Sequence, residues 1–255
     1  MPRTRRIISP VDTYHIMLRG VNHQQIFEEE SDFIKFLSII KTCQQISNFS
    51  IHAYCIMGNH IHLLLTVKGE PLGQCLKRIE NRFVFWYNSK YERIGPLFQG
   101  RFKSEAISDR PYLLNVWRYI QQNPVKAGIC QKMEQYPWSS IHAYCGTPDD
   151  LTDISLVSSL FPDSSALYKF LFQPSEQSFL DIDPIPKNTL TDEEAKKIIY
   201  QLTGCASPSE FQKLDRIRRD FSVKTMRKRG LSTYQINRLT GISRALIYKI
   251  IKQSS

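Results

Sequence analysis

The sequence lacks several features that define whole classes of protein. Its 255 residues include six cysteines, but no Cys-x-x-Cys pair and no spacing typical of a zinc finger. Scattered thiols of this kind indicate a reduced intracellular protein rather than a disulfide-bonded secreted one. No apolar run approaches the roughly 20 residues of a membrane-spanning helix, and the basic N-terminus has no apolar segment long enough for a secretory signal. We therefore expect a cytoplasmic protein without a membrane partner.

Acidic residues are scarce at both ends of the chain and concentrated between them. Residues 213–255 contain 12 Lys and Arg against 2 Asp and Glu, and residues 1–138 contain 18 against 11. Residues 139–212 reverse the balance, with 4 against 11. Two basic regions predict a polyanionic partner at two places. The alternative, that the basic residues only solvate the surface, fits the first region tolerably and the last one poorly.

The apolar pattern alternates between strands and helices over the first half of the chain. Strands are expected over residues 13–18, 49–57, 60–67 and 102–107, with a two-residue turn at Gly58-Asn59. Helices are expected over 30–46, over 71–91 and from 109 onward, the last ending before Pro124 because proline cannot occupy a helix interior. This order favours an α+β fold, an antiparallel sheet with helices packed on one side, of the split βαβ (ferredoxin-like) kind.

The rest of the chain divides into two regions. After a first domain over residues 1–145, residues 146–190 form an acidic connecting region with one expected helix at 164–172. Residues 191–255 form a small all-α module whose helix starts include Thr191-x-x-Glu194 and Ser207-Pro.

Residues 232–251 of this module predict a helix-turn-helix. Ser232 and Ser243 can cap the two helices, and Gly241 lies in the turn between them. The second helix would face a DNA groove, and the basic run before the first would contact phosphates. The expected DNA-binding residues here are Arg227, Lys228, Arg229, Arg244, Tyr248 and Lys249. The alternative is a helical hairpin that binds no nucleic acid.

Two short patterns carry the expected chemistry. His60 and His62 are two apart on a predicted strand, so both side chains point to one face and could form half of a metal site. Tyr119 and Asn123 are four apart on a predicted helix, so a phenol nucleophile and an amide ligand share one face. Each pattern has a plain alternative: two histidines that merely share a strand, and a tyrosine that only packs. The competing tyrosines are Tyr87, Tyr112 and Tyr144.

Four longer sequence motifs contain these residues or lie near them. They are Gly58-Asn-His-Ile-His-Leu-Leu, Gly95-Pro-Leu-Phe-Gln-Gly-Arg-Phe-Lys-Ser104, Arg118-Tyr-Ile-Gln-Gln-Asn-Pro-Val-Lys-Ala-Gly128 and Trp138-Ser-Ser140. The set resembles the IS200-like single-tyrosine (Y1, HUH) transposases over roughly residues 10–145, and most closely their REP-associated tyrosine transposase branch. The chain departs from the family at Gly58, where one usual variant has proline, and at Gln121-Gln122, where relatives often have a histidine.

The resemblance implies a mechanism and a substrate. His60, His62 and Asn123 would hold one divalent cation, Mg²⁺ or Mn²⁺, and Tyr119 would attack the scissile phosphate to leave a 5′-phosphotyrosine. The substrate would be single-stranded DNA beside a small hairpin, in a bacterial cytoplasm and associated with the nucleoid, and the protein a monomer or homodimer. The basic residues expected along the DNA path are Arg78, Arg82, Arg101 and Lys103. Two rival interpretations remain: a replication-initiator or relaxase-type HUH nuclease, and a catalytically silent DNA-binding regulator derived from a transposase.

Overall fold

The protein is described by a computed structural model that covers residues 7–174, 179–180, 190 and 192–252. The chain forms two compact units, Met1–Ile185 and Pro186–Ser255. Among the described helices, none combines the length and the apolar character that crossing a membrane requires.

A four-stranded antiparallel sheet forms the centre of the first unit. Its strands are β1 (Thr13–Arg19), β2 (Phe49–Met57), β3 (His60–Val67) and β4 (Lys103–Ala106), in the spatial order β2-β3-β1-β4. β2 and β3 form the expected hairpin around Gly58-Asn59. β3 pairs with β2 on one side and with β1 on the other, so a side chain on β3 has neighbours from both strands.

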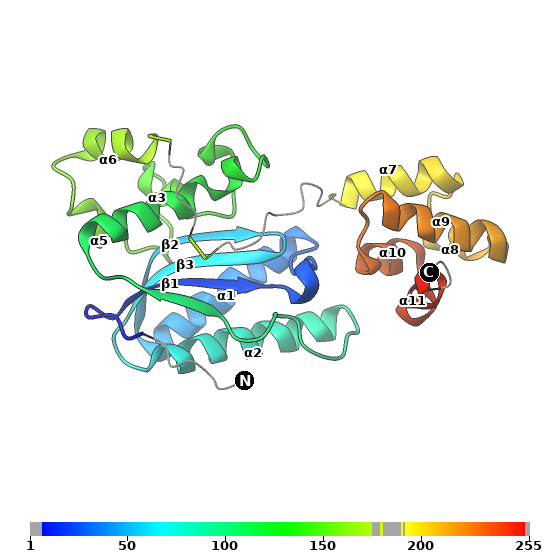
Figure 1. Ribbon diagram of the computed structural model, residues 1–255, viewed down its shortest axis with the longest axis horizontal. Helices are drawn as coiled ribbons and strands as arrows, with labels where there is room; N and C mark the ends of the chain where they lie inside the picture. Colours follow the sequence, from blue (N-terminus) through cyan, green and yellow to red (C-terminus); the bar gives the residue numbers. More distant parts are fainter. Residues whose placement is uncertain (1–6, 175–178, 181–189, 191, 253–255) are drawn as a thin grey trace. The chain divides into compact units, whose positions relative to one another are not determined.

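Helices cover both faces of this sheet, as Figure 1 shows. The helices α1 (Glu30–Ser47) and α2 (Leu72–Lys90) pack on one face, against inward-pointing residues such as Ile16 and Leu63. The helix α3 (Arg110–Lys126) packs on the other face, against Ala53 and Leu64. The predicted α+β class with an antiparallel sheet is confirmed. The placement of all helices on one side is wrong, because Val116, Trp117 and Ile120 of α3 provide an apolar stripe for the second face.

The helix α3 also differs from the prediction at its end. It continues through Pro124 to Lys126, although proline removes one backbone donor from the helix. The proline lies close to the C-terminus, where the Ala127 N–H still reaches the Asn123 carbonyl, so the last turn is kept. Both Tyr119 and Asn123 are consequently held inside one continuous helix.

Residues 146–174, which the sequence assigns to an acidic connecting region, pack on the first unit. The short helices α5 (Ser155–Ser158) and α6 (Ser164–Leu171) follow α4 (Ile141–Tyr144). Leu151 joins the core on the α1–α2 side, whereas Val157, Leu167 and Leu171 join the core around α3. The described part of this segment therefore supports α3 rather than only linking two domains. Two 3-10 turns, Val21–His23 and Met133–Gln135, complete the first unit as described.

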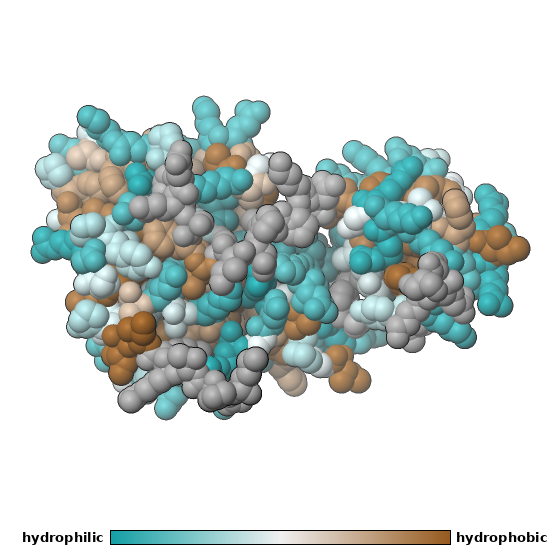
Figure 2. Space-filling model, in the orientation of Figure 1, coloured by the Kyte–Doolittle hydropathy of each residue, from teal (hydrophilic) through white to brown (hydrophobic). Residues whose placement is uncertain are grey.

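The second unit is all-α over its described residues. It comprises α7 (Asp192–Thr203), α8 (Pro208–Gln212), α9 (Arg216–Lys228), α10 (Thr233–Thr240) and α11 (Arg244–Lys252) around a core that includes Phe211, Ile236 and Ile247. Ser232 caps α10 and Ser207 caps α8 as predicted, while Thr191 lies outside the described residues. Gly241 ends α10 with a φ of 71°, a left-handed conformation that glycine adopts at little cost. Hydrophilic side chains cover most of the visible face of this unit in Figure 2.

Candidate active site

The two histidines of the predicted metal half-site lie side by side on β3. His60 and His62 are 3% and 0% exposed, and their ring centres are 5.1 Å apart. Because side chains on a strand alternate between faces, both project to the face that α3 covers. The sequence prediction that the two imidazoles share one face is confirmed by this geometry.

Each imidazole is oriented by a contact to its Nδ1 atom. Nδ1 of His60 lies 2.7 Å from Oδ1 of Asn59, and Nδ1 of His62 lies 3.0 Å from Nε2 of His15. The nitrogen that can bind a cation is then Nε2 in both rings, and both Nε2 atoms are buried. Neutral imidazole with its second nitrogen held by a neighbour is a common metal ligand in proteins.

His60 and His62 are the two imidazole donors that this position offers to a cation. The described residues contain no group of three or more His, Cys, Asp and Glu side chains placed to hold a metal. A third protein ligand would therefore be of another type, and Asn123 offers an amide oxygen. Asn123 is 3% exposed and follows Tyr119 by one turn of α3.

Tyr119 faces the histidines from the opposite layer. Its ring centre lies 5.6 Å from that of His62 and 6.2 Å from that of His15, and the residue is 3% exposed. The helix that carries it starts at the N-cap Asp109, whose carboxylate accepts a hydrogen bond from the Tyr112 N–H. Phenol and imidazoles thus meet within a single chain. The sequence predicted that these groups converge, but not whether one chain or two would supply them.

One positive side chain and one aromatic ring lie next to the phenol. The Lys126 ammonium lies 5.0 Å from the ring centre of Tyr119, and burial, together with the charge of Arg118, lowers the pKa of Lys126. Burial also lowers the pKa of Arg118, which stacks on Phe170 at 4.4 Å. The ring of Phe179 packs against the Tyr119 ring, with centres 5.2 Å apart. An anion next to the phenol would therefore meet positive charge.

The predicted DNA-path residues are divided between two sides of the sheet. Lys103 pairs with Met17 across β4 and β1, which places it on the histidine face, and Arg101 is exposed just before it. Arg78 and Arg82 lie on α2, on the opposite face, and Arg78 forms an ion pair with Glu70 at 2.6 Å. The structure thus brings Lys103 to the side of the histidines and Tyr119, but not Arg78 or Arg82.

Sequence reasoning missed His15 and Glu105, which lie beside His62, and considered Tyr112 only as a competing nucleophile. His15 of β1 lies between His62 and Glu105 of β4, and the Tyr112 hydroxyl donates to Glu105 at 2.9 Å. Strand alternation could have placed His15 on one face of β1. The pairing of β1 with β4, which sets His15 opposite Glu105, joins residues far apart in sequence and carries no local signal.

The two glutamines at the family departure have structural hydrogen bonds. Gln121 donates to the Ser140 hydroxyl at 2.7 Å, and Gln122 donates to the carbonyls of Leu171 and Gln173, each at 2.8 Å. These bonds tie α3 to the segments that follow it. The side chains thereby support the helix that carries Tyr119 and Asn123.

The predicted DNA-binding residues of the second unit are largely on its surface. Lys228 and Arg229 are exposed at the end of α9, and exposed Arg227 donates to the Leu231 carbonyl. On α11, Tyr248 is 49% exposed and Lys249 is exposed, while the side chain of Arg244 lies outside the description. These positions agree with the predicted helix-turn-helix, in which α10 and α11 flank the turn at Gly241.

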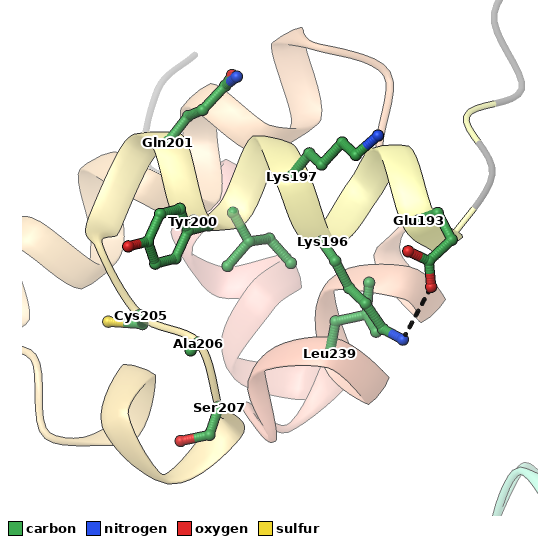
Figure 3. A pocket seen from close by; sticks show the side chains of 10 residues that line it. Glu193, Lys196, Lys197, Tyr200, Gln201, Cys205, Ala206, Ser207 and Leu239 are labelled. Carbon is green, nitrogen blue, oxygen red and sulfur yellow. Dashed lines mark hydrogen bonds and ion pairs between the residues drawn. The ribbon is translucent and has the colours of Figure 1, made fainter.

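The second unit also contains an open pocket of about 330 Å³, shown in Figure 3. It is lined by α7, the segment after it and Leu239 of α10, and Lys196 at its edge pairs with Glu193 at 3.5 Å. None of the residues that the sequence predicts for catalysis, metal binding or DNA binding lines it. The residues that the sequence predicts for catalysis lie in the first unit, where Tyr119 meets His62.

Comparison with known proteins decides the family. The model of the family described as "Transposase IS200 like" matches residues 11–123, a range that contains both histidines, Tyr119 and Asn123. A REP-associated tyrosine transposase of Haemophilus influenzae is 30% identical over 125 residues, which cover 44% of this chain and 70% of that protein. The chain belongs to the IS200-like transposase family. Its relationship to the Haemophilus protein places it in the REP-associated tyrosine branch.

A solved structure supports the fold of this transposase. The structure of a REP-associated tyrosine transposase bound to a REP hairpin superimposes with a TM-score of 0.54 at 18% identity, covering 71% of this chain and 96% of that one. At this identity the likeness concerns the fold, which confirms the sheet-and-helix architecture of the first unit.

Proposed function

We propose that this transposase is a metal-dependent single-stranded DNA endonuclease and strand transferase that acts through a 5′-phosphotyrosine. The observation that carries the proposal is the meeting of Tyr119 with His62 in one chain, at 5.6 Å between ring centres. A phenol beside a metal half-site is the arrangement that phosphoryl transfer to tyrosine requires.

Three residues would hold the cation, and Tyr119 would attack the phosphate. His60 and His62 through Nε2, and Asn123 through its amide oxygen, would hold one Mg²⁺ or Mn²⁺. When bound there, the cation would reduce negative charge on the phosphate oxygens and fix the line of attack. Imidazole and amide are softer than the all-oxygen sets that Mg²⁺ prefers, so stronger activity is expected with Mn²⁺.

The covalent step exchanges one phosphoester bond for another. The Tyr119 oxygen forms a bond to phosphorus as the bond from phosphorus to the 3′ oxygen breaks. The phenol loses its proton to solvent, and the departing 3′ oxygen gains one. Because the phosphotyrosine conserves the ester, a second 3′-hydroxyl can reverse the step and join a new strand without ATP.

Several features support DNA as the partner. The first unit places Lys126 next to the Tyr119 ring and Lys103 on the histidine face of the sheet. The related structure is described as bound to a REP hairpin, which makes hairpin-flanked single strands the natural substrate to test. The second unit exposes basic residues on α9 and α11 and would bind duplex DNA through its helix-turn-helix.

The test is covalent adduct formation on a labelled single-stranded oligonucleotide that contains a REP-type hairpin, in Mn²⁺. The full-length protein should form a shifted band that survives denaturation, and chelation with EDTA should abolish it. Tyr119→Phe should lose the adduct completely while keeping DNA affinity within about threefold, because only the attacking hydroxyl is removed. Tyr87→Phe, a buried tyrosine on the opposite face of the sheet, is the matched control and should keep the adduct. An adduct in Tyr119→Phe would disprove the assignment, and binding without any adduct in the wild type would favour the regulator.

A further inference from the structure

A buried histidine outside the proposed ligand set lies in contact with it. His15 is 0% exposed, and its ring stacks on that of His62 with centres 5.2 Å apart. The strand register explains the arrangement: His15 lies directly opposite Glu105 on β4 and opposite Leu64 on β3, so His62, two residues before Leu64, is its diagonal neighbour on the same face. His62, His15 and Glu105 therefore form a row across three adjacent strands on one face of the sheet.

The row is connected by hydrogen bonds. Nδ1 of His62 lies 3.0 Å from Nε2 of His15, and Nδ1 of His15 lies 3.4 Å from Oε2 of Glu105. The hydroxyl of Tyr112, in the first turns of α3, donates to the same Glu105 oxygen at 2.9 Å. Glu105 is thus held from two sides, by the sheet and by the helix that carries Tyr119.

The carboxylate sets the direction of every bond in the row. The hydrogen bond from His15 lowers the pKa of Glu105, so its oxygens are acceptors at neutral pH. His15 must then donate through Nδ1–H, which leaves its Nε2 as an acceptor when the ring is neutral. His62 in turn donates through Nδ1–H, and its buried Nε2 keeps the lone pair. This tautomer is the one that a cation needs at Nε2.

We propose that His15 and Glu105 are positioning residues that hold His62 in the tautomer and orientation required to bind the divalent cation. The inference rests on the proposed metal site and adds to it two residues that do not touch the cation. His60 needs no such row, because the side chain of its neighbour Asn59 already contacts Nδ1 at 2.7 Å. Outer partners of metal-bound histidines typically contribute about ten- to hundredfold to metal affinity, because they fix the ring and raise its basicity.

The first experiment measures Mn²⁺ affinity of the full-length protein without DNA, from the electron paramagnetic resonance signal of free Mn²⁺. His15→Phe keeps a ring against His62 but no nitrogen, and Glu105→Ala removes the acceptor at a position whose side chain is 33% exposed. Each should raise the Mn²⁺ Kd about ten- to hundredfold. Glu105→Gln retains an oxygen acceptor and should lose less affinity than Glu105→Ala.

His52→Phe is the matched control. His52 is a buried histidine on the same sheet, but its ring contacts Thr66 and the Asp153 carbonyl, at the other end of β3. Thr66 is four residues from His62, about 13 Å along the strand. His52→Phe should leave the Mn²⁺ Kd within about twofold of wild type, even if it destabilises the fold as much as His15→Phe does.

The second measurement is the tautomer of His62 in the metal-free protein, read from ¹⁵N chemical shifts of the imidazole nitrogens. The wild type should show a protonated Nδ1 and an unprotonated Nε2, and Glu105→Ala should show the two tautomers mixed or reversed. Unchanged tautomer and unchanged Mn²⁺ Kd in both His15→Phe and Glu105→Ala would overturn the inference.

His62→Ala separates this inference from the proposed metal site. If His62→Ala loses Mn²⁺ binding and His15→Phe does not, the positioning role fails and the metal site stands. If His62→Ala itself binds Mn²⁺ as tightly as wild type, the metal site fails and the positioning role fails with it.

Discussion

At the scale of single residues, the positive charge beside the nucleophile should raise the rate of attack. Lys126 lies two turns after Tyr119 on α3, with its ammonium 5.0 Å from the phenol ring centre. Attack on a phosphodiester brings negative charge to this position, and a fixed positive charge stabilises it more in the transition state than in the free protein. We predict that Lys126→Met slows adduct formation about tenfold, equivalent to about 1.4 kcal/mol in the barrier.

The comparison that identifies charge as the cause uses two further variants. Lys126→Arg keeps the positive charge and should retain most of the rate, which is measured in single-turnover reactions with saturating oligonucleotide. Lys169→Met removes an exposed lysine of α6 and should have no effect. Equal losses in Lys126→Met and Lys126→Arg would show that shape rather than charge determines the effect.

Residue-level prediction worked best where the pattern was local. The two-residue spacing of His60 and His62 and the four-residue spacing of Tyr119 and Asn123 each fix a shared face within one element. His15 and Glu105 form a pair only because β1 and β4 are adjacent, and this adjacency depends on the packing of the whole sheet. The sequence shows that both residues are present, but it does not show that they contact each other.

At the scale of secondary structure, α3 shows where a local rule gives way to tertiary packing. Proline near a helix end removes one hydrogen bond, a cost that the packing of Val116, Trp117 and Ile120 on the sheet can outweigh. The same packing explains why the helices cover both faces: α3 buries a face of the sheet that α1 and α2 do not reach. The caps, in contrast, follow local sequence, and Ser207, Asp109 and Ser232 all begin helices as their residue types predict.

The cap at Ser232 gives a test at this scale. Its hydroxyl accepts a hydrogen bond from the Gln235 N–H at 3.0 Å, and the Gln235 side chain accepts one in return from the Ser232 N–H. Ser232→Ala leaves donors of the first turn of α10 without this acceptor and should lower the free energy of unfolding of the second unit by about 1 kcal/mol. The measurement is urea unfolding followed by circular dichroism. Ser209→Ala, at an exposed position inside α8, should change the midpoint little, and equal shifts in the two variants would contradict a specific capping role.

At the scale of the whole molecule, the charge distribution along the sequence corresponds to two folded units with different chemistry. The first unit carries the histidine and tyrosine cluster, and the second carries basic residues on α9 and α11 without such a cluster among its described residues. Composition alone predicted two basic regions. It did not predict that residues 151–171 would add to the core of the first unit, because short apolar runs among Pro, Ser and Asp give no clear helical period.

If the second unit binds duplex DNA and the first unit cleaves single strands, duplex affinity and strand cleavage can be changed independently. Lys228 and Arg229 are exposed at the end of α9, and replacing both by glutamine removes two charges that would neutralise phosphates. Lys228→Gln/Arg229→Gln should weaken duplex binding and reduce the slope of log K against log salt by about 0.9 for each phosphate that is no longer neutralised. Adduct formation on a saturating single-stranded oligonucleotide should stay unchanged, because the reacting groups belong to the first unit.

A double variant with the same change of charge tests whether position or net charge is responsible. Lys197→Gln/Lys213→Gln alters two exposed lysines on α7 and just after α8, away from the expected recognition helix in sequence. Fluorescence anisotropy at several salt concentrations should show the full slope for this control and the reduced slope for Lys228→Gln/Arg229→Gln. If both double variants lose the same affinity and slope, the second unit acts through its overall charge. Binding through a helix-turn-helix requires that the effect depend on where the charges lie, since phosphate contacts fix the register of the recognition helix on the duplex.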